Sequence, residues 1–224
     1  MYFKENLNFL SKHHPDFVKD LAEINAFRMQ ELRQGDALPI PDELIQISRF
    51  FDISVDRLLK VNLSLRKHAE NIRLVVFDID GVLTDGGMYY TESGDEFKKF
   101  NSKDGLAIRR LAKEGYLTGV ISHGINVNLI TRRANLLNIP KVYVGNRPKE
   151  EVLLEWCHEI GIQPLDVAYI GDDINDLPVM KIAGFTACPA DAVQEVKKKV
   201  DVVLGLEGGK GCVREWIDEY ILKV

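Results

Sequence analysis

The segment VVFDIDGVLTDG, residues 75–86, decides how the larger part of this 224-residue chain is organised. Its apolar first half predicts a buried β-strand, and two carboxylates, Asp78 and Asp80, follow one residue apart before a turn at Gly81. In an extended backbone residues i and i+2 lie on one side, so both carboxylates can face one ligand. Two acids this close repel each other unless a cation neutralises them, and a hard, oxygen-seeking ion such as Mg²⁺ suits that place.

Beyond this segment, short β-branched runs alternate with helical stretches. Strand-like runs occupy residues 72–79, 117–122, 141–145, 167–173, 185–189 and 201–205. Helical stretches lie between them, at residues 105–115, 128–139, 150–162, 177–184 and 192–200. This alternation predicts an α/β fold built of βαβ units, with a parallel sheet and helices on both of its faces.

In parallel α/β sheets ligands bind beyond the carboxyl ends of the strands, so the residues that follow each apolar run are the candidates for a site. Ser122 follows the run LTGVI, Asp172 lies in GDDIND after VAYI, and Lys149 opens a helix from which its ammonium can reach the same crevice. Such a set suits an aspartate nucleophile that forms an aspartyl-phosphate while a neighbouring acid moves the proton. A hydroxyl and an ammonium would neutralise the phosphate oxygens.

The motifs DIDGVLTDG, VIS, PK and GDDIND stand in the order and at the strand ends seen in the haloacid dehalogenase superfamily of phosphatases, which residues 72–224 resemble. The resemblance implies a Rossmann-like fold and Mg²⁺ as the cofactor. It also implies that Asp78 is the nucleophile and that Asp80 is a general acid/base that binds Mg²⁺ through its carbonyl. Ser122 and Lys149 would contact the phosphate oxygens, and Asp172 would be the third metal ligand. Asp173 and Asp176 would be supporting acids, one of which orients Lys149 or a metal-bound water. The alternative, solvated acids that merely end strands, is disfavoured because the set falls at one sheet edge together with a lysine.

The intervals from Asp80 to Ser122 and from Ser122 to Lys149 are filled by the predicted helices and strands, which leaves no room for a cap domain. A capless site takes a large substrate or is covered by a neighbouring subunit. Residues 86–100, GGMYYTESGDEFKKF, predict a β-hairpin that turns at Ser93-Gly94, and its aromatic face could pair between subunits.

Residues 80–111 and the segment GGKGCVREWID, residues 208–218, are similar to the 3-deoxy-D-manno-octulosonate 8-phosphate phosphatase family. This resemblance implies a homotetramer that removes phosphate from an eight-carbon keto sugar acid in lipopolysaccharide biosynthesis. It also implies that residues 208–214 reach the active site of an adjacent subunit. Relatives that act on nine-carbon sialic-type acid 9-phosphates provide the alternative substrate.

The chain departs from the family pattern after the hydroxyl at Ser122, where SHGINVN is one residue longer than expected. His123 and Asn126 are the candidates to read the substrate there, with Arg132 or Arg133 as the candidate for the sugar carboxylate. The alternatives are a plain loop histidine and charges on the outer face of a helix. The identity of the sugar acid therefore stays open.

Residues 1–64 predict a small all-α domain, and the polar residues 65–71 predict a linker. Residues 25–59 resemble the second half of a Cro-like helix-turn-helix domain, although Glu23 stands where that family has its glycine turn. The resemblance implies a helix cap at Asn25, core-facing Met29 and Leu32, a helix end at Gly35, and two further helices at 42–50 and 54–60.

DNA binding would need a basic footprint, but residues 1–68 hold ten Lys/Arg and ten Asp/Glu. This balance favours a vestigial or oligomerising module over DNA binding. Arg28, Gln30 and Arg33 remain the candidates to touch DNA, and the alternative function is a DNA-binding regulator whose second domain senses a sugar phosphate.

The composition, 46% hydrophobic and 28% charged, is that of a globular protein. A net charge of -5 argues against a general polyanion binder, and no apolar run is long enough for a membrane span. The N-terminus lacks the pattern of a secretion signal, and the three widely spaced cysteines, Cys157, Cys188 and Cys212, suit reduced thiols. The expected location is the cytoplasm.

Overall fold

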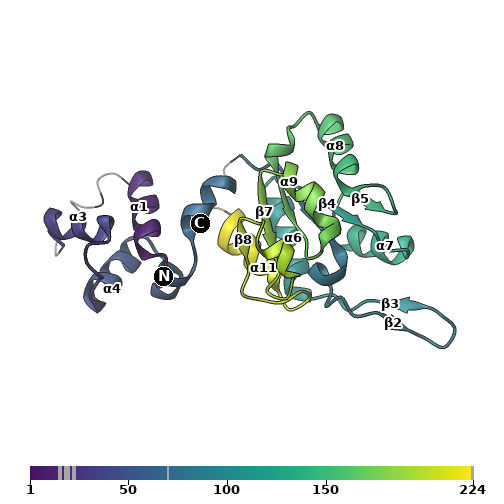
Figure 1. Ribbon diagram of the computed structural model, residues 1–224, viewed down its shortest axis with the longest axis horizontal. Helices are drawn as coiled ribbons and strands as arrows, with labels where there is room; N and C mark the ends of the chain where they lie inside the picture. The colour runs from purple at the N-terminus through teal and green to yellow at the C-terminus, as the bar shows by residue number, and fades with distance from the viewer. Residues whose placement is uncertain (15–16, 18–20, 22–23, 70, 223–224) are drawn as a thin grey trace. The chain divides into compact units, whose positions relative to one another are not determined.

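The computed structural model describes the chain apart from residues 15–16, 18–20, 22–23, 70 and 223–224 (Figure 1). Glu23, which the sequence places at an expected turn, lies outside the described residues. The chain divides into two compact units, residues 1–67 and 68–224. No helix in the described part of the chain has the length and the apolar character needed to span a bilayer.

The first unit is helical. Its described elements are α1 (Phe3–His13), α3 (Ala26–Gln34), α4 (Pro41–Phe50) and α5 (Val55–Lys60), and the 3-10 helix η1 (Leu63–Ala69) follows. As predicted, the Asn25 side chain accepts a hydrogen bond from the Arg28 amide over 2.8 Å, and α3 ends at Gly35 with φ 79°. Met29 and Leu32 are buried in the core of this unit. These details confirm the predicted helices, whereas the helix-turn-helix identity stays a prediction.

Arg28, a candidate DNA contact, is held inside its own unit. Its Nε lies 2.7 Å from Glu43 Oε1 and its Nη2 lies 3.1 Å from Glu43 Oε2, while Nη2 also donates to the Leu38 carbonyl over 2.9 Å. Hydrogen bonds to Glu43 and Glu31 raise the pKa of Arg28 further above its ordinary value. A forked pair of this kind fixes the guanidinium of Arg28. Arg33 is held as well, because its Nε donates to Asn8 Oδ1 over 3.1 Å, and the contacts of Arg28, Gln30 and Arg33 with DNA stay predictions.

The second unit is built on six parallel strands, all of which coincide with predicted runs. The strand order is β5-β4-β1-β6-β7-β8. The strands are β1 (Leu74–Phe77), β4 (Leu117–Ser122), β5 (Lys141–Val144), β6 (Val167–Ile170), β7 (Phe185–Cys188) and β8 (Val202–Val203). Phe77 at the end of β1 is paired with Val120 on one side and Ile170 on the other, so β1 lies at the centre. The buried, β-branched character of these strands is what a sheet covered on both faces requires.

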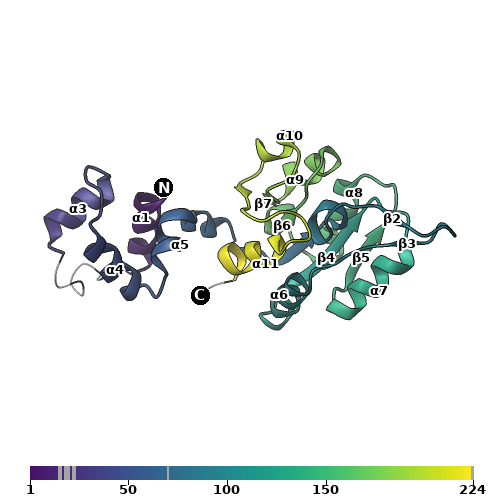
Figure 2. The same cartoon turned by 90° about the horizontal axis from the view of Figure 1, so that it is seen from below.

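Helices cover both faces of the sheet, as predicted. Figure 2 shows α8, α9 and α10 on one side and α6, α7 and α11 on the other. Their bounds are α6 (Ser102–Lys113), α7 (Val127–Leu137), α8 (Lys149–Ile160), α9 (Leu177–Ile182), α10 (Gln194–Lys197) and α11 (Cys212–Trp216), with short turns η3 (Pro164–Asp166), η4 (Ile174–Asp176) and η5 (Ile217–Ile221). Alternate residues of β1 serve the two faces: Val76 packs in the cluster that contains Trp156, whereas the ring of Phe77 meets Trp216 at 6.3 Å. The cysteines are buried and free.

A β-hairpin projects from this unit (Figures 1 and 2). Its strands are β2 (Tyr89–Tyr90) and β3 (Glu96–Phe97), and the Thr91 amide donates to the Asp95 carbonyl over 2.9 Å across a turn that contains Ser93 and Gly94. The prediction of a hairpin is confirmed. Between Asp80 and Ser122, all described, the chain forms only a turn, this hairpin, α6 and β4, so no cap domain is present there.

Candidate active site

Three neighbouring strands deliver the predicted site residues to one edge of the sheet. Asp78 directly follows β1, Ser122 ends β4, and Asp172 lies just beyond β6. The chain connections run outward from β1 in both directions, and such a switch point leaves a crevice at the carboxyl ends of the strands. The Asp78 amide still donates to the Ile170 carbonyl over 3.0 Å, so the backbone ladder continues to Asp78, the predicted nucleophile.

Asp78, Asp172 and Asp176 form an acid cluster, in which each offers a carboxylate oxygen within 4.8 Å of the others. Asp176 is predicted to be a supporting acid, and its carboxylate lies in the same cluster as those of Asp78 and Asp172. Asp173, the other predicted supporting acid, is exposed and accepts a hydrogen bond from the Ile174 amide over 2.7 Å.

Lys149 supplies the positive charge of the cluster. Its Nζ lies 2.9 Å from Asp78 Oδ1 and 2.6 Å from Asp176 Oδ1, and its side chain is fully buried. An ammonium out of water is stable only with such partners, and here burial is outweighed by Asp78 and Asp176, which raise the pKa of Lys149. Of the two supporting acids, Asp176 is therefore the one that orients Lys149.

Asp176 receives further hydrogen bonds from the chain around it. The buried hydroxyl of Tyr169 donates to Oδ1 over 2.6 Å, while the amides of Asp172 and Asp173 donate to Oδ2 over 3.0 and 3.3 Å. A Cβ at Gly171 would lie 2.3 Å from the Asp176 carboxyl carbon, so glycine is required there. Tyr169 is not among the site residues predicted from the sequence. Its signal is a phenol in a buried strand, where the hydroxyl needs a hydrogen-bond partner.

The electrostatics of the cluster fit a divalent cation. Burial, with the charge of Asp176 adding to it, raises the pKa of Asp78 to about 7 even though Lys149 opposes the shift. Burial and then the charges of Asp78 and Asp176 raise the pKa of Asp172 to about 8. Crowded carboxylate oxygens with raised pKa values are the hard donors that Mg²⁺ prefers, and its charge would relieve their repulsion.

The turn after Asp78 brings a fourth acid, Asp80, and a second lysine, Lys98, to the site. Gly81 has φ 82°, and a Cβ there would lie 2.0 Å from Asp172 Oδ2, so only glycine lets the turn approach the cluster. Asp80, just before it, is bound by Lys98, whose Nζ lies 2.6 Å from Oδ1. The predicted metal contact of Asp80 involves its backbone carbonyl and stays a prediction.

Known proteins share this chain's sequence and fold. A family model described as haloacid dehalogenase-like hydrolase matches residues 121–213. The 3-deoxy-D-manno-octulosonate 8-phosphate phosphatase KdsC of Yersinia pestis is 39% identical over 156 residues, which are 70% of this chain and 83% of that protein. KdsC of Escherichia coli K12 is 38% identical over 154 residues, 69% of this chain and 81% of its own. The chain belongs to the 3-deoxy-D-manno-octulosonate 8-phosphate phosphatase family of haloacid dehalogenase-like hydrolases.

A member of this phosphatase family with bound ligands has a similar fold. The crystal structure of the enzyme from Moraxella catarrhalis, in complex with a magnesium ion, a phosphate ion and KDO, matches with a TM-score of 0.67 and 31% identity, over 69% of this chain and 88% of that one. The Yersinia pestis crystal structure matches with a TM-score of 0.68 and 38% identity, over 70% and 84%. At these identities the similarity supports a shared family as well as a shared fold.

Two of the predicted substrate contacts of the present chain, His123 and Asn126, already have hydrogen-bond partners within the chain. His123 is exposed, and its Nε2 lies 3.0 Å from the Arg147 carbonyl oxygen while Nδ1 lies 3.3 Å from Asn175 Nδ2. Asn126 caps α7 by accepting a hydrogen bond from the Leu129 amide over 3.3 Å. Their roles toward substrate stay predictions.

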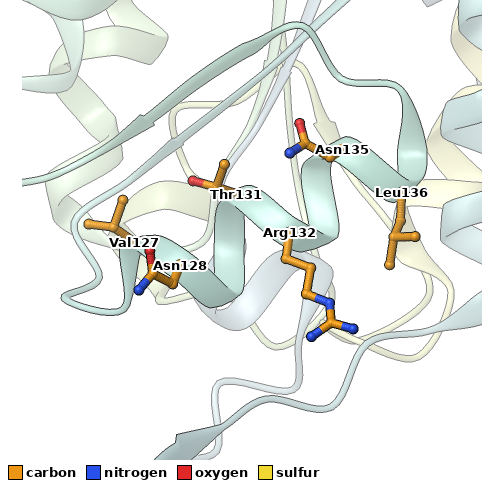
Figure 3. A pocket seen from close by; sticks show the side chains of 6 residues that line it. All are labelled: Val127, Asn128, Thr131, Arg132, Asn135 and Leu136. Atoms are coloured by element: carbon orange, nitrogen blue, oxygen red, sulfur yellow. The ribbon is translucent and has the colours of Figure 1, made fainter.

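The two candidate arginines lie on different faces of α7. Arg132 is exposed and lines a pocket on the outer face of the helix together with Asn128, Asn135 and their neighbours (Figure 3). Arg133 is half-buried, with its guanidinium carbon 5.0 Å from the centre of the Phe100 ring. The exposed position of Arg132 is that of an ordinary surface charge. The contact of either arginine with a sugar carboxylate stays a prediction.

The C-terminal glycine segment packs against the turn of its own chain. A Cβ at Gly208 would lie 2.0 Å from the Gly81 carbonyl oxygen, and the Gly209 amide donates to the Val82 carbonyl over 2.9 Å. Asn101 Nδ2 donates to the Gly209 carbonyl over 3.2 Å. These contacts place the segment beside the active-site turn, and its predicted reach into an adjacent subunit stays a prediction.

Proposed function

We propose that this phosphatase hydrolyses 3-deoxy-D-manno-octulosonate 8-phosphate with Mg²⁺ as its cofactor. The observation that carries the proposal is the buried Lys149 held between Asp78 and Asp176, with Asp172 in the same acid cluster. Such a cluster can bind a phosphoryl group through charge and positioning, which are the main contributions that proteins make to phosphoryl transfer. The curated relatives carry this substrate in their names, and the Moraxella catarrhalis enzyme holds magnesium, phosphate and KDO.

The proposed roles of the side chains are those that the family resemblance implies. An oxygen of Asp78 attacks phosphorus, the bond from phosphorus to the sugar oxygen breaks, and Asp80 gives its proton to that leaving oxygen. Asp80 then takes a proton from water as the water oxygen attacks the aspartyl-phosphate, which frees inorganic phosphate and restores Asp78. Lys149 and Ser122 contact the phosphate oxygens throughout.

Mg²⁺, held by Asp78, Asp172 and the Asp80 carbonyl, would offset negative charge on the phosphate and on the cluster. Lys149 does part of the same work, because its ammonium, 2.9 Å from Asp78 Oδ1, favours the ionised carboxylate and so opposes the rise that burial causes in the pKa of Asp78. An ionised nucleophile beside a neutralised phosphate is what the first step requires.

A phosphate-release screen of the purified chain tests the substrate. We expect the eight-carbon 8-phosphate to be hydrolysed fastest, ahead of nine-carbon sialic-type acid 9-phosphates and of hexose phosphates as controls. A clear preference for a nine-carbon ester would replace the proposed substrate with the alternative. Asp78→Asn should abolish both phosphate release and covalent trapping while circular dichroism shows an intact fold, and full activity in this variant would contradict the mechanism.

We also infer that the chain forms a homotetramer in which the β-hairpins of different subunits pair, and that it is located in the cytoplasm. The rings of Tyr89 and Phe97 stack at 5.4 Å, and Met88, Tyr90 and Phe97 are exposed, so the hairpin offers an apolar surface that a second copy would bury. Sedimentation velocity should give the mass of a tetramer, reduced by Phe97→Ser. A monomeric wild-type chain would contradict this part of the proposal.

A further inference from the structure

Lys98 connects the β-hairpin to the active-site turn. Its side chain is 2% exposed, and its Nζ lies 2.6 Å from Asp80 Oδ1 and 2.7 Å from Oε1 of Glu96 in β3. Burial disfavours its ammonium, but the two carboxylates raise the pKa of Lys98 overall. A lysine that leaves water to meet two carboxylates is fixed in place much more firmly than a surface lysine.

The contact fixes which oxygen of Asp80 is available. Asp80 lies on a turn and its side chain is 34% exposed; besides Lys98, its Oδ1 has the Thr84 hydroxyl as a donor at the longer distance of 3.5 Å. With Oδ1 held by Lys98, the other oxygen faces the loop after β4: a Cβ at Gly124 would lie 3.6 Å from Asp80 Oδ2 and 3.2 Å from Ser122 Oγ. Ser122 is the proposed phosphate contact, so Oδ2 lies on the side of the site where the ester would bind.

We propose that Lys98 is a positioning residue that holds Asp80 Oδ1, and thereby aims Oδ2 at the leaving oxygen of the substrate. The inference rests on the proposed function, because it needs Asp80 to be the acid that protonates the leaving group. Glu96 anchors the other side of the Lys98 ammonium, so the placement of the proton donor depends on the hairpin.

Comparing two substrates with different leaving groups distinguishes a positioning role of Lys98 from a purely structural role. A sugar alkoxide is a poor leaving group and needs the proton of a well-placed acid, a contribution of about 100-fold or more to the rate. A p-nitrophenolate leaves without that help. Loss of positioning therefore lowers hydrolysis of the sugar phosphate selectively, whereas partial unfolding or loss of phosphate binding lowers hydrolysis of both esters alike.

The test compares Lys98→Met with Lys99→Met in the full chain, using 3-deoxy-D-manno-octulosonate 8-phosphate and p-nitrophenyl phosphate. Lys99 is the matched control: its side chain is 65% exposed, and its Nζ lies 3.5 Å from Asp85 Oδ2. For Lys98→Met we expect kcat on the sugar phosphate to fall about 10- to 100-fold, and kcat on p-nitrophenyl phosphate less than about 3-fold. Lys99→Met should change neither by more than about 2-fold.

Equal losses on the two esters, or no loss on either, would overturn the inference. Glu96→Gln should give the same selective loss of kcat on the sugar phosphate, but a smaller one. An unchanged rate in this variant would overturn the claim that the placement of Asp80 depends on the hairpin. A wild-type chain that hydrolyses neither ester would refute the proposed function itself. That result is distinguishable from a failure of the inference, which depends on the ratio of the two losses of kcat, on the sugar phosphate and on p-nitrophenyl phosphate, in Lys98→Met.

Discussion

The hydroxyl of Tyr169 donates a hydrogen bond of 2.6 Å to Oδ1 of Asp176, the same oxygen that Lys149 contacts. Because a hydrogen bond to a charged group contributes about 1.5–3 kcal/mol, Tyr169→Phe should lower the free energy of unfolding by a similar amount, measured by urea denaturation. It should also lower kcat about 10-fold, since a displaced Asp176 moves Lys149.

Tyr143→Phe is the matched control for Tyr169→Phe. The Tyr143 hydroxyl accepts a hydrogen bond from the Arg147 amide over 2.9 Å near the surface, so both quantities should stay close to those of the wild type. If the two variants behave alike, the buried hydroxyl of Tyr169 has no special part in holding the cluster.

Lys149→Met should damage both catalysis and stability. It leaves Asp78 and Asp176 buried without the cation that both contact, and breaking a buried pair in this way costs about 3–5 kcal/mol. Phosphate release should fall at least about 100-fold, because the ammonium also neutralises the phosphate. Lys141→Met, which removes a surface pair with Glu159, should change neither quantity appreciably. A Lys149 variant with the wild-type rate would contradict the proposed site.

Stabilisation by Mg²⁺ should increase with pH. Without metal, the pKa values of Asp78 and Asp172 are raised to about 7 and about 8, above the value of about 3.9 for an unfolded aspartate. The folded chain therefore binds more protons than the unfolded chain between about pH 4 and about pH 8. Its free energy of unfolding falls as the pH rises across this range, and the contribution of the two protons is lost above the folded pKa values of about 7 and about 8.

Mg²⁺ competes with those protons, so the rise in melting temperature on adding about 10 mM MgCl₂ should be larger at about pH 8.5 than at about pH 6. Differential scanning fluorimetry measures both shifts. Asp172→Asn should reduce the difference, because it removes one of the two titrating ligands. Equal shifts at the two pH values in the wild-type chain would contradict the assignment of the acid cluster as the metal site.

The sequence predicted the sheet and the edge at which the site lies for a simple physical reason. Buried parallel strands are apolar runs of a few residues, so a polar residue at the end of each run marks the same edge of the sheet. Asp78, Ser122 and Asp172 were found by this reasoning, and the structure places each at its expected strand end.

The pairing within the site was beyond sequence reasoning. Tyr169 and Asp176 meet because a strand and the turn after it fold back on each other, and Lys98 meets Asp80 through the hairpin. Spacing along the chain indicates which residues reach the edge, but not which oxygen each donor contacts. The same limit applies to His123, whose ring nitrogens lie near groups from two other loops.

Gly208→Ala should disturb the active-site turn through backbone contact alone. Its Cβ would lie 2.0 Å from the Gly81 carbonyl oxygen and 3.1 Å from the Thr84 carbonyl oxygen, and neither backbone atom can rotate away as a side chain would. Either the glycine segment or the turn that carries Asp80 must therefore shift. We expect a cost of about 1–3 kcal/mol in the free energy of unfolding and a loss of about 10-fold or more in kcat.

Gly205→Ala, in the same segment, is the control for Gly208→Ala. A Cβ there would meet only the Glu215 carboxylate, at 3.3 Å from Oε1. This carboxylate accepts hydrogen bonds from the Gly205 and Leu206 amides, and the small shift that the Cβ requires leaves both bonds in reach. The control should keep its rate and its urea midpoint close to those of the wild type. A Gly208→Ala variant with wild-type kcat would mean that the segment can lift from the turn without moving Asp80, which would separate the C-terminal segment from the chemistry of the site.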